Sequence, residues 1–230
     1  MRKSDNEQKT SWSDLPYVLP FAVFIGFLAL QKYVPLPPNI EFLARDLLLA
    51  GVLLGFSRHV IQLRPAHWLG TVALGVAVCV IWVAPDLLFP NYRHNWLFQN
   101  AIFGQLSAMT IPENVLKSPW VLWPRILQAV IFVPILEELF WRAWLMRWLI
   151  SPQFEKIPLG TYQAGAFWIT AALFASEHGP YWDVGLIAGI AYNWWMVRTR
   201  SLGDCILVHA VTNACLCAYV VFTRHWEYWQ

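Results

Sequence analysis

Charge is what this sequence has least of. Only 13% of its 230 residues are Asp, Glu, Lys or Arg, whereas 58% are hydrophobic, and the mean hydropathy is +0.45. Soluble globular domains carry about 25% charged residues, so the composition excludes an ordinary soluble enzyme. The formal net charge is only +2 and no basic run occurs, which argues against a nucleic-acid partner.

The sequence also lacks the short motifs of several enzyme classes. It contains no H-E-x-x-H, no G-x-S-x-G and no C-x-x-C, and Ser201–Asp204 lacks the first glycine of a G-x-G-D motif. These absences argue against a zincin, a serine hydrolase and an intramembrane aspartyl protease. The four cysteines lie in apolar runs, and we expect small buried side chains at Cys79, Cys205, Cys215 and Cys217.

Long apolar runs are abundant instead, and many begin or end on aromatic residues, of which there are 15 Trp, 8 Tyr and 14 Phe. Aromatic rings of this kind anchor at the membrane–water interface. A helix needs about 20 mostly apolar residues to cross a bilayer. The sequence therefore predicts an all-α, polytopic transmembrane helical bundle with seven spans, at residues 15–33, 41–57, 68–89, 120–148, 161–178, 182–197 and 202–222.

The runs divide the chain into four parts. Residues 1–14 form a polar tail without a signal-peptide cleavage site, 15–119 hold three spans and an interfacial segment, 120–222 form the core, and 223–230 form a second tail. Residues 90–119 mix polar, charged and proline residues with apolar patches, which favours an interfacial segment. An eighth span in this region is kept as an alternative. If the N-terminus is cytoplasmic, the cytoplasmic segments hold nine basic residues and the segments on the other side hold five. This excess favours a cytoplasmic N-terminus, and we expect a bacterial inner-membrane protein.

Ionisable residues inside the spans are costly and usually functional. An uncharged run, 126–136, leads directly into Glu137, Glu138 and, four residues later, Arg142. Glu138 and Arg142 share a helix face and can pair, whereas Glu137 points elsewhere and is available as a general base. Pro134 frees the Val130 carbonyl and bends this helix. A structural ion pair, with Glu137 reaching water, is the alternative.

Two further polar pairs lie on later apolar segments. Phe174 and His178 are four residues apart at the end of the fifth segment, and His209 and Asn213 are four apart within the seventh. Each pair shares a helix face. His178 can serve as a partner imidazole or as an interfacial residue, and the pair on the seventh segment can hold an oxyanion or join helices. Together with Glu137 they supply what water-mediated amide hydrolysis requires.

The ordered motifs E-E-x-x-x-R, F-x-x-x-H and H-x-x-x-N resemble the CAAX prenyl protease and bacteriocin-processing (CPBP) family of intramembrane glutamic proteases. The resemblance covers about residues 120–222 and implies an intramembrane endopeptidase. In it Glu137 and His178 activate water, His209 and Asn213 form the oxyanion hole, and Glu138, Arg142 and Phe174 support them. The chain is also similar to bacterial CAAX-protease-related proteins associated with exosortase and PEP-CTERM sorting, which implies a sorting-system partner.

The resemblance implies no cofactor and no metal. It implies a membrane-anchored protein substrate and leaves open whether that substrate is lipidated or C-terminally tailed. Two other functions are kept as alternatives. One is a non-catalytic membrane partner or immunity-type protein that retains the motif residues for packing. The other is a metal-dependent hydrolase, because Glu137, His178 and His209 are residue types that can bind zinc. Glu177, beside His178, is an extra acid with no assigned role.

Overall fold

The computed structural model describes residues 13–31, 33–101, 104 and 111–229. Within these ranges the chain is largely helical, and the only β-type pairing is an isolated bridge between Asn100 and Gly104. Apolar segments form helices because a helix satisfies all of its backbone hydrogen bonds internally, which hydrocarbon surroundings demand. The all-α class predicted from the sequence is confirmed.

Every predicted span contains a helix. The proline-rich turn before Pro38 separates the first two helices, as its composition indicates. The bounds are α2 (Leu15–Gln31), α3 (Pro38–Val52) with a π turn η1 (Leu53–Ser57), α4 (Trp68–Leu88), the continuous run from α6 (Pro119–Leu127) to α8 (Met146–Trp148), α9 (Ala164–Ser176), α10 (Trp182–Thr199) and α11 (Leu202–Thr223).

Three of the described helices are long and apolar enough to cross a membrane: Trp68–Leu88, Pro119–Trp148 and Leu202–Thr223. Two more, α2 and α9, are apolar but shorter. Large apolar side chains also lie on the protein surface, as a lipid-facing exterior requires; examples are Leu47, Leu54, Trp120 and Phe222. The chain is an integral membrane protein, and its crossing number of seven stays a prediction.

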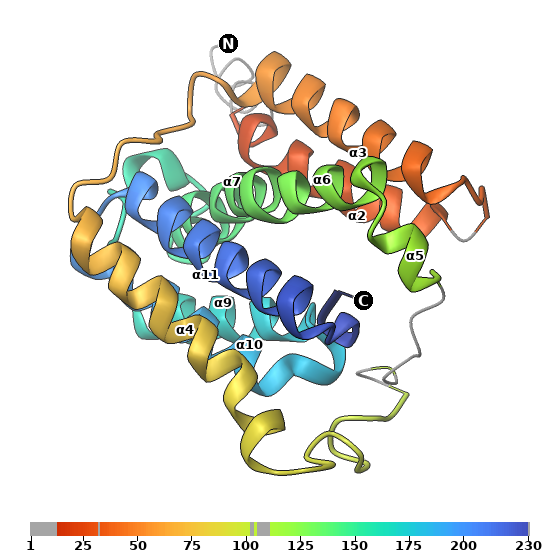
Figure 1. The fold of residues 1–230 in the computed structure, drawn as a ribbon. Coiled ribbons are helices and arrows are strands. Elements are labelled where there is room, and N and C mark those ends of the chain that lie inside the picture. Colours follow the sequence, from red (N-terminus) through yellow and green to blue (C-terminus); the bar gives the residue numbers. More distant parts are fainter. Residues whose placement is uncertain (1–12, 32, 102–103, 105–110, 230) are drawn as a thin grey trace.

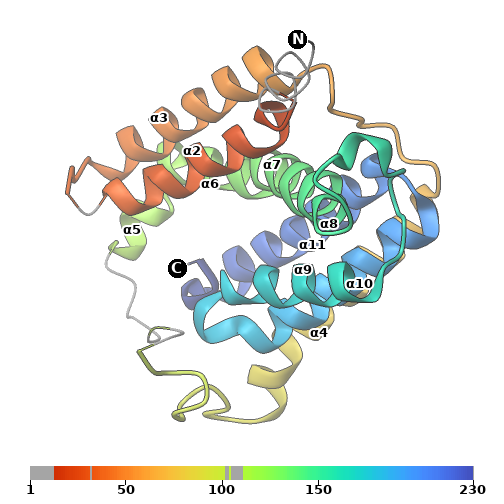
Figure 2. The ribbon, with the colours of Figure 1, turned by 180° about the vertical axis from the view of Figure 1, so that it is seen from behind.

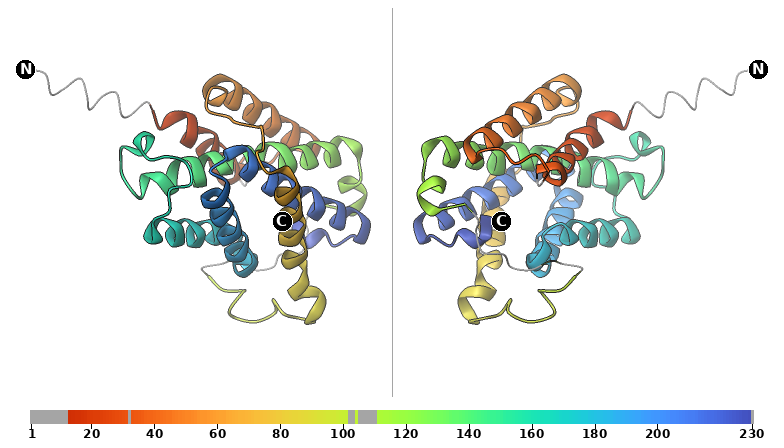
Figure 3. Two further views of the ribbon diagram at one scale, coloured as in Figure 1. Left: turned by 90° about the vertical axis from the view of Figure 1, so that its left-hand side faces the viewer. Right: turned by 90° about the vertical axis from the view of Figure 1, so that its right-hand side faces the viewer.

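The helices form two groups (Figures 1 and 2). In one group α2 and α3 lie against the run from α6 to α8, and in the other α4 lies along α11 and α9 lies along α10. Helix α11 also contacts α7 and so joins the groups. The loop that follows α4 lies at the opposite end of the molecule from α2 and α3 (Figure 3).

The run from α6 to α8 is not a regular α-helix. It contains two π turns, η2 (Gln128–Phe132) and η3 (Leu139–Leu145), on either side of α7 (Val133–Glu138). Pro134 has no N–H to donate, and η2 lies directly before it, around the Val130 carbonyl that the sequence predicted to be freed. Single π turns are often found at functional sites, and these two flank Glu137 and Glu138.

The segment between α4 and α6 contains no spanning helix in its described part. Turns follow α4, and α5 (Glu113–Leu116) is a single turn. Residues 102–103 and 105–110, on which the interfacial and eighth-span predictions also bear, lie outside the described residues, as do residues 1–12 of the N-terminal tail. The C-terminal tail folds back as η6 (Trp226–Trp229) and buries both terminal tryptophans against Phe42 and Val121.

The cysteines are packing residues, as predicted. All four are free thiols. Cys79, Cys205 and Cys217 are buried, and Cys215 is partly buried. They serve as small apolar side chains in the helix contacts.

Candidate active site

One cavity of about 620 Å³ lies between the two helix groups. Its walls include Glu137 of α7, His178 at the end of α9, and His209 and Asn213 of α11. Phe174 also lines it. The structure thus brings the four predicted catalytic residues, which are spread over 77 positions of sequence, to a single cavity.

Glu137 is the available acid of this cavity. Its side chain is buried, and its Oε2 atom has no hydrogen-bond partner. Buried carboxylate oxygens are normally satisfied, so an unsatisfied one requires a functional or solvent explanation. Glu137 also lines the cavity, where its carboxyl group can accept a hydrogen bond from a water molecule or a substrate.

Glu138, one residue later, is engaged on another face. Arg142 Nη1 donates to Glu138 Oε1 over 3.0 Å, which confirms the predicted pair. His209 Nδ1 lies 2.9 Å from the same oxygen. Glu138 and Arg142 are fully buried, and His209 nearly so. The contact from Glu138 to His209 ties α7 to α11 and fixes the orientation of the imidazole.

Arg142 has a second partner that the sequence reasoning missed. Its Nε atom donates to Asn193 Oδ1 over 3.0 Å, and Asn193 Nδ2 donates to the Phe167 carbonyl over 2.8 Å. Asn193 is fully buried on α10. An amide among the apolar residues of a predicted span was the available signal, since such residues commonly join membrane helices.

His178 is held by its own helix. Its Nδ1 lies 2.8 Å from the Phe174 carbonyl, which can only accept, so Nδ1 carries the proton and Nε2 is the acceptor of the neutral ring. The Phe174 ring centroid lies 4.7 Å from that of His178 and 6.1 Å from that of His209. The Arg142 guanidinium lies 4.4 Å above Phe174. Phe174 is therefore the packing centre of the site.

Asn213 is also held in place by a backbone carbonyl of the other helix group, the one that contains the run from α6 to α8. Its Nδ2 donates to the Ala129 carbonyl in η2 over 2.8 Å. An amide nitrogen has two donors, and this bond uses one of them. The second N–H is available to the cavity that Asn213 lines.

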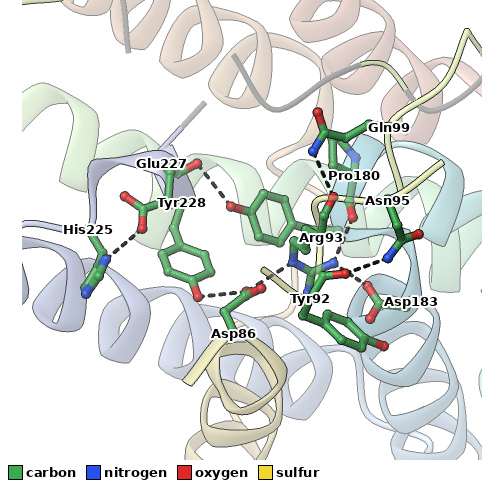
Figure 4. Close-up of polar contacts among 11 residues, drawn as sticks. Asp86, Tyr92, Arg93, Asn95, Gln99, Pro180, Asp183, His225, Glu227 and Tyr228 are labelled. Atoms are coloured by element: carbon green, nitrogen blue, oxygen red, sulfur yellow. Dashed lines mark hydrogen bonds and ion pairs between the residues drawn. The ribbon is translucent and has the colours of Figure 1, made fainter. Parts of the chain in front are cut away.

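A polar network fixes the turn that follows His178 (Figure 4). Arg93 donates to the Pro180 carbonyl over 2.8 Å, to Asp183 over 2.7 Å and to Asp86 over 3.0 Å. Tyr228 donates to Asp86 over 2.8 Å. Burial lowers the pKa of Arg93, but the hydrogen bond and attraction of its two carboxylates outweigh burial and raise the pKa overall. Arg93 therefore stays cationic and holds the loop after α4, the turn beyond His178 and the C-terminal segment together.

Glu177 lies beside this arrangement, close enough for its charge to act on Glu137 and Arg142. It is exposed at the end of α9, and it is not among the residues that line the cavity. Its role stays unassigned. Among the described residues no three His, Cys, Asp or Glu side chains are grouped so that they could hold a metal ion.

Comparison with known proteins adds one match. Residues 119–215 match the family model described as type II CAAX prenyl endopeptidase Rce1-like. The chain carries a CAAX protease family domain. No curated protein and no solved structure matches the chain. The matched part of the CAAX protease domain contains Glu137, His178, His209 and Asn213, whereas α2, α3 and α4 lie outside it.

Proposed function

We propose that the protein is an intramembrane endopeptidase in which Glu137 and His178 activate a water molecule. The proposal is supported chiefly by the shared cavity, which is lined both by Glu137, whose carboxylate has an unpartnered oxygen, and by His178, whose Nε2 is an acceptor. The water donates one proton to Glu137 and attacks the carbonyl carbon of the substrate. The same carboxyl group then returns the proton to the leaving amine as the C–N bond breaks, so the products are a carboxylic acid, which keeps the second proton of the water, and an amine.

The oxyanion formed in this step is stabilised by Asn213 and His209. Asn213 supplies the amide N–H that Ala129 does not use. His209 uses Nδ1 to donate to ionised Glu138, so its Nε2 donates to the oxyanion only when the ring is an imidazolium. Glu138, itself held by Arg142, stabilises that cation. Glu138 and Arg142 are thus positioning residues rather than catalytic ones.

The substrate we propose is a membrane-associated protein with a peptide tail. The cavity lies between helices that carry lipid-facing apolar side chains, which favours a substrate already in the bilayer. The excess of basic residues in alternate segments supports a cytoplasmic N-terminus in a bacterial inner membrane. The resemblance to sorting-associated proteins supports a sorting-system partner for this substrate.

The proposal is tested with purified protein in phosphatidylcholine vesicles that contain synthetic peptides with one apolar anchor and different tails. We expect the release of tail fragments, measured by mass spectrometry, to continue after dialysis against EDTA and 1,10-phenanthroline. Loss of cleavage with the chelators, regained on adding Zn²⁺, would favour the metal-dependent alternative. Absence of cleavage of every peptide by folded protein would favour the non-catalytic one.

A further prediction concerns Gly185, which faces His178. A Cβ atom at Gly185 would lie 3.1 Å from the Cγ and Nδ1 atoms of the His178 ring. The branched side chain of Gly185→Val would displace this ring, and displacing a reacting group by about 1 Å costs about 100-fold in rate. We expect kcat/KM to fall by about this factor while the protein stays folded. Gly26→Val is the matched control, because nothing lies within 4 Å of that Cβ. Full activity in Gly185→Val would contradict the role of His178.

A further inference from the structure

His178 lies in the turn between two helices and not within either of them. Helix α9 ends at Ser176 and α10 begins at Trp182, with η5 (Gly179–Tyr181) between them. The hydrogen bond between Nδ1 and the Phe174 carbonyl fixes one atom of the imidazole. The direction of the main chain at His178 depends on what holds the turn, because a residue beyond a helix end lacks the repeating backbone hydrogen bonds of the helix.

Arg93 holds this turn through its backbone. Its Nη1 atom donates to the Pro180 carbonyl over 2.8 Å and to Asp183, in the first turn of α10, over 2.7 Å. Its Nε atom donates to Asp86, near the end of α4, over 3.0 Å. Arg93 is 2% exposed and lies between the two carboxylates (Figure 4). Hydrogen bonds between ionised groups are among the strongest in proteins, so the turn is tied firmly to the end of α4.

A series of ring contacts leads from the same guanidinium to the imidazole. The Arg93 guanidinium lies 4.3 Å from the centroid of the Tyr181 ring. Tyr181 stacks on Trp82, with centroids 6.4 Å apart and ring planes at 18°. Trp82 forms a T-shaped contact with His178, with centroids 5.2 Å apart. Cation–π and aromatic contacts depend on orientation, so a movement of Tyr181 is expected to reach the imidazole through Trp82.

These contacts come from outside the part of the chain that matches the CAAX protease family, residues 119–215. Trp82 belongs to α4, and Arg93 lies in the loop that follows it. Helix α4 packs against both α10 and α11, which makes it a rigid support for the turn. The catalytic chemistry proposed above uses neither Trp82 nor Arg93.

We propose that Arg93 is a positioning residue of the endopeptidase that fixes the orientation of the His178 imidazole. It does so by holding the turn after His178 and by supporting the ring contacts that end on the imidazole. This inference rests on the proposed function and adds a residue to it. Arg93 does not line the cavity, so it acts through His178 alone. A planar guanidinium with donors on separate nitrogens suits the three acceptors around it.

The first test observes the His178 ring itself. Protein containing isotope-labelled histidine in detergent gives one Hε1–Cε1 NMR resonance for each histidine, and His178→Gln and His209→Gln assign two of them. The position of the His178 resonance depends on the neighbouring rings, including Trp82. We expect Arg93→Gln to move the His178 resonance and to leave that of His209, on α11, in place. If the His178 resonance does not move, or if both move equally, the inference is overturned.

The second test is kinetic and uses the vesicle assay with anchored peptides. Displacing a reacting group by about 1 Å costs about 100-fold in rate, so we expect Arg93→Gln to lower kcat by about 10- to 100-fold. KM should stay unchanged, because only the chemical step is affected. In a His178→Gln background the same change should cause no further loss, since both remove the same contribution. A folded Arg93→Gln protein with the wild-type kcat would overturn the inference, as would an equal loss in both backgrounds.

Arg224→Gln is the matched control. Arg224 is an exposed arginine whose surface ion pair with Glu113 spans 3.7 Å, and such pairs contribute little. This variant should leave the His178 resonance and kcat unchanged. If Arg93→Gln does not fold, Tyr181→Leu interrupts the ring contacts and keeps the hydrogen bonds of Arg93. It should also move the His178 resonance, and an unmoved resonance there would count against the inference.

The two tests separate this inference from the proposed function. The NMR measurement needs no substrate. A shift of the His178 resonance in Arg93→Gln, absent from Arg224→Gln, supports the positioning role even if the wild-type protein hydrolyses no peptide. Hydrolysis by the wild-type protein that is insensitive to Arg93→Gln would refute the inference and leave the endopeptidase mechanism in place.

Discussion

Replacement of Glu137 by glutamine is expected to lower kcat by about 10²–10⁴-fold, the range contributed by a general base. Glutamine has nearly the same shape as glutamate but cannot take a proton from water. Glu137 Oε2 has no hydrogen-bond partner, so the substitution breaks no contact of that atom. We therefore expect the loss of cleavage without a loss of thermal stability, measured in parallel on one detergent-purified sample.

Glu155→Gln is the control for this variant. Glu155 is exposed in the loop before α9 and does not line the cavity, so the same change of charge there should leave the rate within a few fold of the wild type. A folded Glu137→Gln protein that cleaves at the wild-type rate would refute the endopeptidase mechanism. That result would favour a non-catalytic protein in which the motif serves packing.

The second large effect is expected on stability, from Arg142→Ala. Arg142 is fully buried and donates to Glu138 and Asn193, so its removal leaves Asn193 Oδ1 without its donor and the buried Glu138 carboxylate with His209 alone. Breaking a buried ion pair from one side costs about 3–5 kcal/mol. In a chain of this size that corresponds to a fall in Tm of roughly 10 °C, which differential scanning fluorimetry in detergent can measure.

Two further variants complete the measurement. Arg198→Ala, at an exposed position on α10, should change Tm by at most a degree or two. The double variant Glu138→Gln with Arg142→Met should recover part of the lost stability, because it removes both charges of the pair. An unchanged Tm in Arg142→Ala would show that Glu138 and Asn193 find other partners, contrary to the arrangement described.

The candidate site was predictable where it depends on one helix. The four-residue spacing of Glu138 and Arg142 predicted their ion pair, and the same spacing predicted that Phe174 lies beside His178. Contacts between helices were not predictable in this way. The bond from Glu138 to His209 joins residues 71 positions apart and depends on how α7 and α11 cross. Periodicity carries no information about such crossings.

The fold was likewise predictable within single helices and not in the contacts between them. Apolar run length placed all seven helical segments, because backbone hydrogen bonding in hydrocarbon leaves few alternatives. It did not reveal that Arg45 and Arg125 line the same cavity as Glu137. That juxtaposition depends on α3 packing across α6, a contact between two lipid-facing helices whose apolar surfaces are interchangeable by composition.

The π turn at Gln128–Phe132 determines which way Arg125 faces relative to Glu137. In a regular helix each residue turns by about 100°, so twelve steps would leave the two side chains about 120° apart. A π turn inserts one residue without advancing the helical wheel, so only eleven steps count and the offset falls to about 20°. The extra residue thus acts as a register shift that brings Arg125 and Glu137, which both line the cavity, onto one face of a single helix.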